Sequence, residues 1–194
     1  MNDTYDGISA EQWQKELSGQ SDWNARHLMI AFATLGLPKT FLDVGCGDGT
    51  MVNVARHLGV LSYGVDQLID DQWDKTAFSH HNLVDRYVHP YQCELVLCLE
   101  VAEHLHPSAH ATLCDTLVGN LKEGRGNYLI FSAALPNQGG IGHVAERPPK
   151  YWMDQFALRG LNFRRDLTIN LSLHWSNIGS PLTWLAANVQ VWEK

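Results

Sequence analysis

The stretch Phe41-Leu42-Asp43-Val44-Gly45-Cys46-Gly47-Asp48-Gly49 places three glycines at alternate positions directly after a short apolar segment. Residues 41–44 are typical of a buried strand, and residues 50–58 have the periodicity of an amphipathic helix that ends at Gly59. Glycines at this spacing let the backbone turn sharply and approach a ligand closely. The N-terminus of the following helix offers unpaired N–H groups. The stretch therefore predicts a cofactor-binding loop at the carboxyl end of a strand.

The spacing of this loop differs from that of dinucleotide-binding loops, which read G-x-G-x-x-G. Thr50 occupies the position of the third glycine, and Asp43 lies two residues before the first one. A carboxylate at that position would repel a pyrophosphate but could hold a cationic amino group. A second predicted strand, residues 62–66, ends in Asp66, where an acid can accept hydrogen bonds from both hydroxyls of a ribose.

The pattern D-x-G-x-G-x-G, followed by a strand that ends in an acid, resembles the first motifs of the class I S-adenosylmethionine-dependent methyltransferases. The resemblance spans about residues 38–194 and implies a methyltransferase that uses this cofactor. In that family a residue after the third strand binds the adenine amino group, and Asn82 can accept the same hydrogen bond. The cofactor-binding residues that the resemblance implies are Asp43, Gly45, Cys46, Gly47, Gly49, Asp66, Gln67, Asn82, Leu83 and Leu99.

The composition indicates a globular protein, because 45% of the 194 residues are hydrophobic and 18% are charged. No segment has the length and apolarity of a membrane span, and no secretory signal is expected, so we expect a cytoplasmic location. The four cysteines have no metal-finger spacing, and Cys93 and Cys98 are expected to be reduced core residues. A net charge of −7 argues against sequence-independent binding of nucleic acid.

The order of the predicted elements indicates an α/β fold with a doubly wound, mostly parallel seven-stranded sheet, as in Rossmann-like methyltransferases. Strands are predicted over residues 41–44, 62–66, 80–83, 94–100, 127–133, 162–171 and 183–192, and helices over 50–58, 68–76, 107–122 and 149–159. The last two strands have no predicted helix between them, which favours a terminal antiparallel hairpin. Residues 1–37 are predicted to form N-terminal helices, a candidate substrate lid, and residues 38–194 a single methyltransferase domain.

Acidic and imidazole side chains follow the strand 94–100. Glu100, Glu103 and His104 stand at i, i+3 and i+4, so one helical turn would place all three on one face. Two carboxylates and an imidazole that converge there could bind a divalent cation. The string E-V-x-E-H-L also resembles a segment of many class I methyltransferases that use no metal, where it shapes the cofactor pocket.

A glycine-rich loop, residues 136–149, follows the strand 127–133 and is predicted to wrap a ligand or to move as a lid. His143 lies in this loop, just beyond the carboxyl end of the strand. E-x-x-E-H with a later histidine resembles the metal site of the small-RNA 3′-terminal 2′-O-methyltransferases, and ubiquinone-pathway O-methyltransferases show similar elements. The resemblance implies a Mg²⁺- or Mn²⁺-like ion with the ligands Glu100, Glu103, His104 and His143.

A competing role for His143 is that of general base. Methyl transfer to a hydroxyl requires the removal of one proton. An imidazole that accepts this proton can accelerate the reaction about 10²–10⁴-fold. His143 is therefore the first catalytic candidate, and Glu146 and Glu103 are the others.

Several further residues have two interpretations. His80, His81 and His89 are expected to be solvated loop residues rather than metal ligands, because they lack the convergent spacing of a metal site. Trp13, Trp23 and His27 either cover the substrate or pack in a core. The basic residues Arg147, Lys150, Arg159, Arg164 and Arg165 form a solvated surface or bind a phosphorylated acceptor.

Two absent motifs bear on the acceptor. The chain has Leu99-Glu100-Val101-Ala102 where amino-methylating families carry an Asp/Asn-Pro-Pro-Tyr/Phe turn, and it contains no Pro-Cys dipeptide for cytosine chemistry. The sequence therefore favours O-methylation of a small-molecule or sugar hydroxyl. The alternatives are ribose 2′-O-methylation of RNA, favoured if Arg164 and Arg165 line the pocket, and a non-catalytic cofactor-binding partner subunit.

Overall fold

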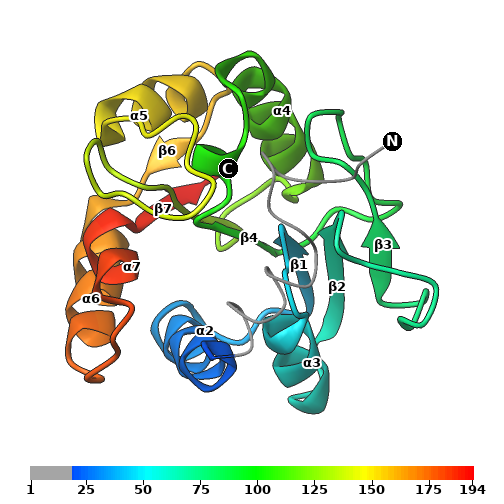
Figure 1. Ribbon diagram of the computed structural model, residues 1–194. Coiled ribbons are helices and arrows are strands. Elements are labelled where there is room, and N and C mark those ends of the chain that lie inside the picture. Colours follow the sequence, from blue (N-terminus) through cyan, green and yellow to red (C-terminus); the bar gives the residue numbers. More distant parts are fainter. Residues whose placement is uncertain (1–18) are drawn as a thin grey trace.

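A computed structural model describes residues 19–194 of the chain, and these residues form one seven-stranded sheet with helices on both faces (Figure 1). The strands lie in the order β3-β2-β1-β4-β5-β7-β6. Their bounds are β1 Thr40–Val44, β2 Leu61–Asp66, β3 Phe78–His80, β4 Leu95–Leu99, β5 Tyr128–Ser132, β6 Asn162–Phe163 and β7 Gln190–Glu193. The first five are parallel, and β7 pairs antiparallel with both β5 and β6. The predicted doubly wound, mostly parallel sheet is confirmed.

The helices cover two separate hydrophobic cores, one on each face of the sheet. Their bounds are α2 Ser21–Leu35, α3 Thr50–His57, α4 His110–Asn120, α5 Pro149–Ala157, α6 Arg165–Ser176 and α7 Thr183–Asn188, with short 3₁₀ turns η1 Ala102–His104 and η2 Pro107–Ala109. Leu95 and Leu97 of β4 contribute to the core under α2, α3, α6 and α7, and Val96 and Cys98 to the core under α4 and α5. Successive strand side chains point to opposite faces, so a strand buried on both faces is apolar throughout.

The C-terminal part of the chain differs from the prediction. Most of the predicted strands 162–171 and 183–192 are the helices α6 and α7, and only short ends of them are the strands β6 and β7. Leu167, Leu171 and Trp175 recur at i, i+4 and i+8 and pack into the core that α2 shares. β6 and β7 are antiparallel neighbours at the end of the sheet, as predicted, although two helices rather than a short turn connect them in the chain.

The segment between β2 and β3 also departs from the prediction, because no helix forms over residues 68–76. The side chains of Asp70 and Asp74 accept hydrogen bonds from the backbone N–H groups two residues later, of Gln72 and Thr76. Such turns compete with the helical hydrogen-bond pattern. The third strand accordingly forms earlier than predicted, at residues 78–80.

Helix α2 is held against the sheet by α6. His27 is fully buried, and the indole Nε1 of Trp175 donates a 3.0 Å hydrogen bond to its carbonyl oxygen. The two rings meet edge to face at 5.1 Å. His27 is therefore a packing residue, whereas the predicted lid residue Trp13 lies outside the described residues. None of the helices within residues 19–194 has the length and apolarity needed to cross a bilayer.

Candidate functional site

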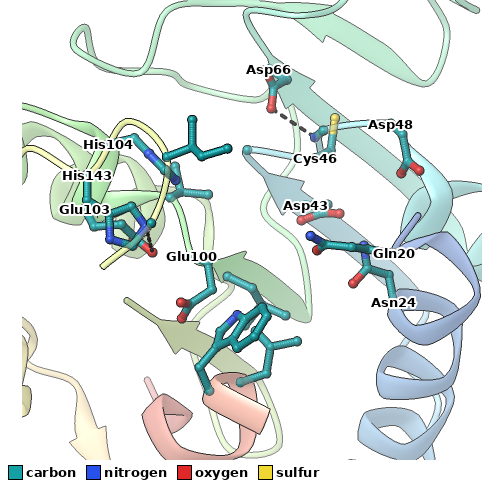
Figure 2. A pocket seen from close by; sticks show the side chains of 18 of the residues that line it. Gln20, Asn24, Asp43, Cys46, Asp48, Asp66, Glu100, Glu103, His104 and His143 are labelled. Carbon is teal, nitrogen blue, oxygen red and sulfur yellow. Dashed lines mark hydrogen bonds and ion pairs between the residues drawn. The ribbon is translucent and has the colours of Figure 1, made fainter. Parts of the chain in front are cut away.

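A pocket of about 430 Å³ opens where the parallel strands end, and Figure 2 shows its two sides. The glycine loop and the acidic ends of β1 and β2 form one side, and the side chains that follow β4 and β5 form the other. The structure thus brings together residues that the sequence analysis predicted separately. Those that line the pocket are Asp43, Gly45, Cys46, Gly47, Asp66, Leu99, Glu100, Glu103, His104 and His143.

The glycine loop adopts a backbone that only glycine adopts easily. Gly45, Gly47 and Gly49 have φ angles of 80°, 53° and 71°. A Cβ atom on Gly45 would lie 2.4 Å from Cγ2 of Val101, which follows β4. The N–H of Gly47 donates a 3.0 Å hydrogen bond to Oδ2 of Asp66, which ties the loop to the end of β2. The loop is therefore fixed between two strands.

Three carboxylates lie beside this loop, and they make this side of the pocket electronegative. Burial, together with the charges of Asp66 and Asp48, raises the pKa of Asp43 to about 8. Burial also raises the pKa of Asp66, although N–H groups of Leu68 and Gly47 oppose this. A cationic ligand would reduce the repulsion among these carboxylates, whereas an anionic ligand would be repelled by them.

A cluster of Glu103, His104 and His143 forms the opposite side. One ligand atom from each of these residues lies within 4.8 Å of the other two. Glu103 is fully buried, and among the described residues neither of its carboxylate oxygens has a hydrogen-bond partner. Burial, and then the charge of Glu100, raises the pKa of Glu103 well above its usual range. Burial of a carboxyl group without hydrogen-bond partners costs free energy, unless a bound ligand provides those partners.

The two histidines of this cluster have fixed ring orientations. Nδ1 of His104 lies 3.0 Å from the carbonyl oxygen of Gly142, and Nδ1 of His143 lies 2.9 Å from Oε1 of Glu146. Because both partners are acceptors, each Nδ1 carries the proton, and a neutral ring would then have its lone pair on Nε2. Burial lowers the pKa of His104 to about 4, which keeps that ring neutral at pH 7. Nε2 of His143 lies 4.0 Å from Oε1 of Glu103.

The glycine-rich loop after β5 holds His143 in place. Glu146 accepts hydrogen bonds from the N–H groups of Asn137 (2.6 Å) and Gly139 (2.7 Å) in addition to the one from His143. A Cβ atom on Gly140 would lie 2.3 Å from Nε2 of His143, so this position requires glycine. The hydrogen bond from His143 lowers the pKa of Glu146. Glu146 is thus placed to orient His143, and it is not itself part of the pocket lining.

Glu100 does not share a helical face with Glu103 and His104, so that part of the prediction was wrong. The 3₁₀ turn begins only at Ala102, and Glu100 has a left-handed φ of 52°. Its carboxylate instead accepts hydrogen bonds from Nε2 of Gln138 (3.0 Å) and Nδ2 of Asn188 (3.2 Å).

Some predicted residues lie away from the pocket. Gly49, Gln67, Asn82 and Leu83 are not part of its lining. Oδ1 of Asn82 accepts a hydrogen bond from the N–H of Val84. Arg164 and Arg165 do not line it either, and Arg164 pairs with Asp166 and Glu193. Arg147, Lys150 and Arg159, the other members of the predicted basic group, are also absent from the lining.

His89 was wrongly expected to be solvated. It is buried, and its ring lies 4.1 Å from that of Tyr63. His80 is exposed, as expected.

The lining also contains residues that the sequence analysis missed. These are Gln20, Asn24, Asp48, Gln138 and Trp184 among others. Asp48 lies within the glycine loop, and this position could have identified it as a residue of the pocket. Gln20 and Asn24 are four residues apart at the start of α2, whereas Trp184 lies in a segment predicted to be a strand, so neither pattern pointed to a pocket.

Comparison with known proteins agrees with this geometry. A family model described as a methyltransferase domain matches residues 17–174. A protein from Caenorhabditis briggsae, named as a probable tRNA (uracil-O(2)-)-methyltransferase, is 37% identical over 109 residues. The aligned region covers 56% of this chain but only 17% of that protein.

Solved structures share the fold at low sequence identity. Human N-acetylserotonin methyltransferase in complex with SAM superposes with a TM-score of 0.59 and 11% identity, over 96% of this chain and 56% of that chain. The N-methyltransferase NodS from Bradyrhizobium japonicum WM9, in complex with S-adenosyl-L-homocysteine, gives 0.56 and 18%, over 74% and 76% of the two chains.

Proposed function

The chain belongs to the methyltransferase domain family and is a class I S-adenosylmethionine-dependent methyltransferase, and we propose that it methylates a hydroxyl group of a small-molecule or sugar acceptor. One observation carries this proposal: a single pocket is lined both by the glycine loop and by His143, whose ring orientation is fixed. The cofactor and the proton acceptor would therefore meet in one cavity.

We propose that the cofactor binds against Asp43, Gly45, Cys46, Gly47 and Asp66. The carboxylates of this side suit the ammonium and the sulfonium of S-adenosylmethionine, and they would repel a pyrophosphate. Gln20 and Asn24 line the same side, where Figure 2 shows them beside Asp43. Their amides can donate to the cofactor carboxylate, which supports a role for the start of α2 as the cover of this side.

His143 is the proposed general base. S-adenosylmethionine, when bound, supplies a methyl group on a positively charged sulfur that leaves as a neutral thioether. Nε2 of His143 takes the hydroxyl proton as the acceptor oxygen forms its bond to the methyl carbon. Glu146 stabilises the resulting imidazolium through its hydrogen bond with Nδ1.

The same cluster supports an alternative role in binding a divalent cation. Glu103, His104 and His143 would supply one carboxylate and two Nε2 atoms, and both Nδ1 atoms already have acceptors, as is usual for metal-binding histidines. The buried, unpartnered oxygens of Glu103 fit this role. Mixed carboxylate and imidazole ligands suit Mn²⁺ or Fe²⁺ better than Mg²⁺. Such an ion would orient the hydroxyl and lower its pKa.

The second candidate acceptor is a ribose hydroxyl of RNA. The name of the C. briggsae relative favours it, although the aligned region is a small part of that protein. The pocket offers it little support, because Arg164 and Arg165 lie outside the lining. The family and the intact cluster favour an enzyme over a non-catalytic partner subunit.

Two measurements test the proposed function. Calorimetry with S-adenosylhomocysteine, in Mn²⁺ and in EDTA, should show cofactor binding in both, and methyl transfer that persists in EDTA would support the base role over the metal role. A radiolabelled-methyl screen of sugars, polyols, phenols and short RNA should give a base-stable methyl ether on a sugar or polyol. Transfer to RNA alone would support the second candidate instead.

A further inference from the structure

The pocket combines many negative side chains with no positive ones. Its lining includes the five carboxylates of Asp43, Asp48, Asp66, Glu100 and Glu103, and within residues 19–194 no lysine or arginine belongs to it. Burial and neighbouring carboxylates raise the pKa values of Asp43 and Glu103, so this lining already carries negative charge that no lysine or arginine of the described lining offsets. An acceptor with a phosphate beside the reacting hydroxyl would enter against this charge.

Glu100 is a carboxylate of the lining that Figure 2 shows close to Glu103, across the pocket from Asp43. Gln138 donates to its Oε2 at 3.0 Å, and Asn188 donates to its Oε1 at 3.2 Å. Asn188 also donates to Oε1 of Gln138 at 2.9 Å, which fixes the amide that holds Glu100. A carboxylate has about four lone-pair positions, so these two donors leave acceptor capacity on a group that lines the cavity.

The backbone of Glu100 has an unusual conformation, with a left-handed φ of 52°. Glu100 and Asn137 are the non-glycine residues with positive φ among the described residues. A non-glycine residue persists in the left-handed region only where its surroundings hold it, and such residues concentrate at ligand sites. The neighbouring Glu103 adds two buried oxygens without partners. This part of the pocket therefore presents hydrogen-bond acceptors and requires donors from its ligand.

We propose that Glu100 is a specificity-determining residue that receives an uncharged or cationic hydrogen-bond donor of the acceptor, such as a neighbouring hydroxyl or ammonium group, and that the pocket excludes acceptors phosphorylated near the reacting hydroxyl. This inference rests on the proposed function and names its substrate class. It holds whether His143 acts as a base or as a metal ligand.

A cofactor analogue tests the role of Glu100 before any acceptor is known. Sinefungin carries an amine on carbon in place of the methyl-bearing sulfonium, so its ammonium points to where the acceptor would lie. Calorimetry in EDTA at pH 7 would compare its Kd with that of S-adenosylhomocysteine. We expect sinefungin to bind at least tenfold more tightly to the wild-type protein, and this preference to fall below threefold in Glu100→Gln.

The matched control is Glu123→Gln, which makes the same change at an exposed side chain outside the pocket and should keep the wild-type preference. The wild-type ratio needs no variant, so it stays informative if Glu100→Gln does not fold. Equal affinities in the wild type, or an unchanged preference in folded Glu100→Gln, would overturn the inference. Failure of both compounds to bind would instead contradict the proposed cofactor site.

Exclusion of phosphorylated acceptors has its own test. Methyl transfer would be compared within the pair ribose and ribose 5-phosphate, and within a nucleoside and the corresponding short RNA. Greater transfer to the uncharged member supports the inference, and greater transfer to the phosphorylated member or to RNA overturns it.

Discussion

His143 illustrates how neighbouring residues determine what one side chain can do. Its Nδ1 proton is engaged by Glu146, and Gly140 approaches the ring too closely to carry a side chain. The ring is therefore held with Nε2 toward Glu103, on the wall of the pocket. A histidine free to rotate would present this nitrogen only part of the time, so the glycine-rich loop contributes orientation.

Replacing His143 should impair turnover and leave cofactor binding intact. We expect His143→Gln to lower kcat by about 10²–10⁴-fold, because glutamine cannot accept the hydroxyl proton. The Kd of S-adenosylhomocysteine should change by less than about threefold, because the proposed cofactor side lies across the pocket. Radiolabelled-methyl transfer and calorimetry measure the two quantities. His57→Gln, at an exposed position of α3, is the control, and an undiminished kcat in His143→Gln would refute the catalytic role.

The pKa of Asp43 leads to a pH dependence of cofactor binding. In the free protein burial and nearby carboxylates raise this pKa to about 8, so Asp43 is mostly protonated at pH 6. The ammonium of S-adenosylhomocysteine favours the ionised form, so binding releases a proton and affinity rises with pH up to about 8, by at most tenfold per pH unit. Calorimetry in two buffers of different ionisation enthalpy counts the released protons. Asp43→Asn should abolish the release, and pH-independent binding by the wild type between pH 6 and 8 would contradict the prediction.

Among the elements, the turn between β1 and α3 is held by hydrogen bonds to two others, β2 and α2. The N–H groups of Gly45 and Cys46 both donate to the carbonyl oxygen of Val65 in β2, and Asp48 receives a hydrogen bond from Ser21 of α2. Two strands and a helix therefore meet at this turn. Its shape depends on all three, and so does the wall of the pocket that it forms.

A pair of glycine substitutions separates backbone strain from local crowding. Gly45 and Gly59 have φ angles of 80° and 83°, but an added Cβ at Gly59 meets no atom within 4 Å. Both alanine variants should lose about 1–2 kcal/mol of stability from the left-handed backbone. Only Gly45→Ala should also weaken the binding of S-adenosylhomocysteine, by at least tenfold, because its Cβ would displace Val101. Urea denaturation and calorimetry measure these effects, and equal cofactor affinities of the two variants would disprove the crowding argument.

At the scale of the whole molecule, the pocket is assembled from segments far apart in the chain. Gln20 and Asn24 come from the start of the described residues, and Trp184 and Leu185 come from α7 near the C-terminus. The strand order places β1 and β4 side by side in the middle of the sheet, which creates the crevice between their loops. The site therefore exists only after these distant segments have come together in the folded chain.

A bound metal would stabilise the whole fold. If Glu103, His104 and His143 bind Mn²⁺, a concentration 100 times its Kd should raise the free energy of unfolding by about 2.7 kcal/mol, since the unfolded chain lacks the site. For a chain of this size the melting temperature should rise by about 5–10 °C. Thermal melts in Mn²⁺ and in EDTA measure the shift. Glu103→Gln should melt at the same temperature in both, and identical wild-type curves would exclude the metal role and leave His143 as the base.

The sequence by itself determined the α/β class, the glycine loop with Asp43 and Asp66, and His143 as a residue near Glu103 and His104. Local patterns in the sequence are enough to predict these features. Glycines after a strand indicate a tight turn, and residues that follow parallel strands lie at the same edge of the sheet. The same local reasoning failed for α6 and α7, whose apolar residues pack against α2 and were read as strands.

Only the tertiary structure decided the position of Glu100 and the full wall of the pocket. Sequence spacing assigned Glu100 to the helical turn of Glu103 and His104. Its left-handed backbone and its hydrogen bonds with Gln138 and Asn188 instead hold it outside that turn. Those partners are 38 and 88 residues away in the chain. No local pattern encodes such contacts, because they form only when the sheet brings the ends of its strands together.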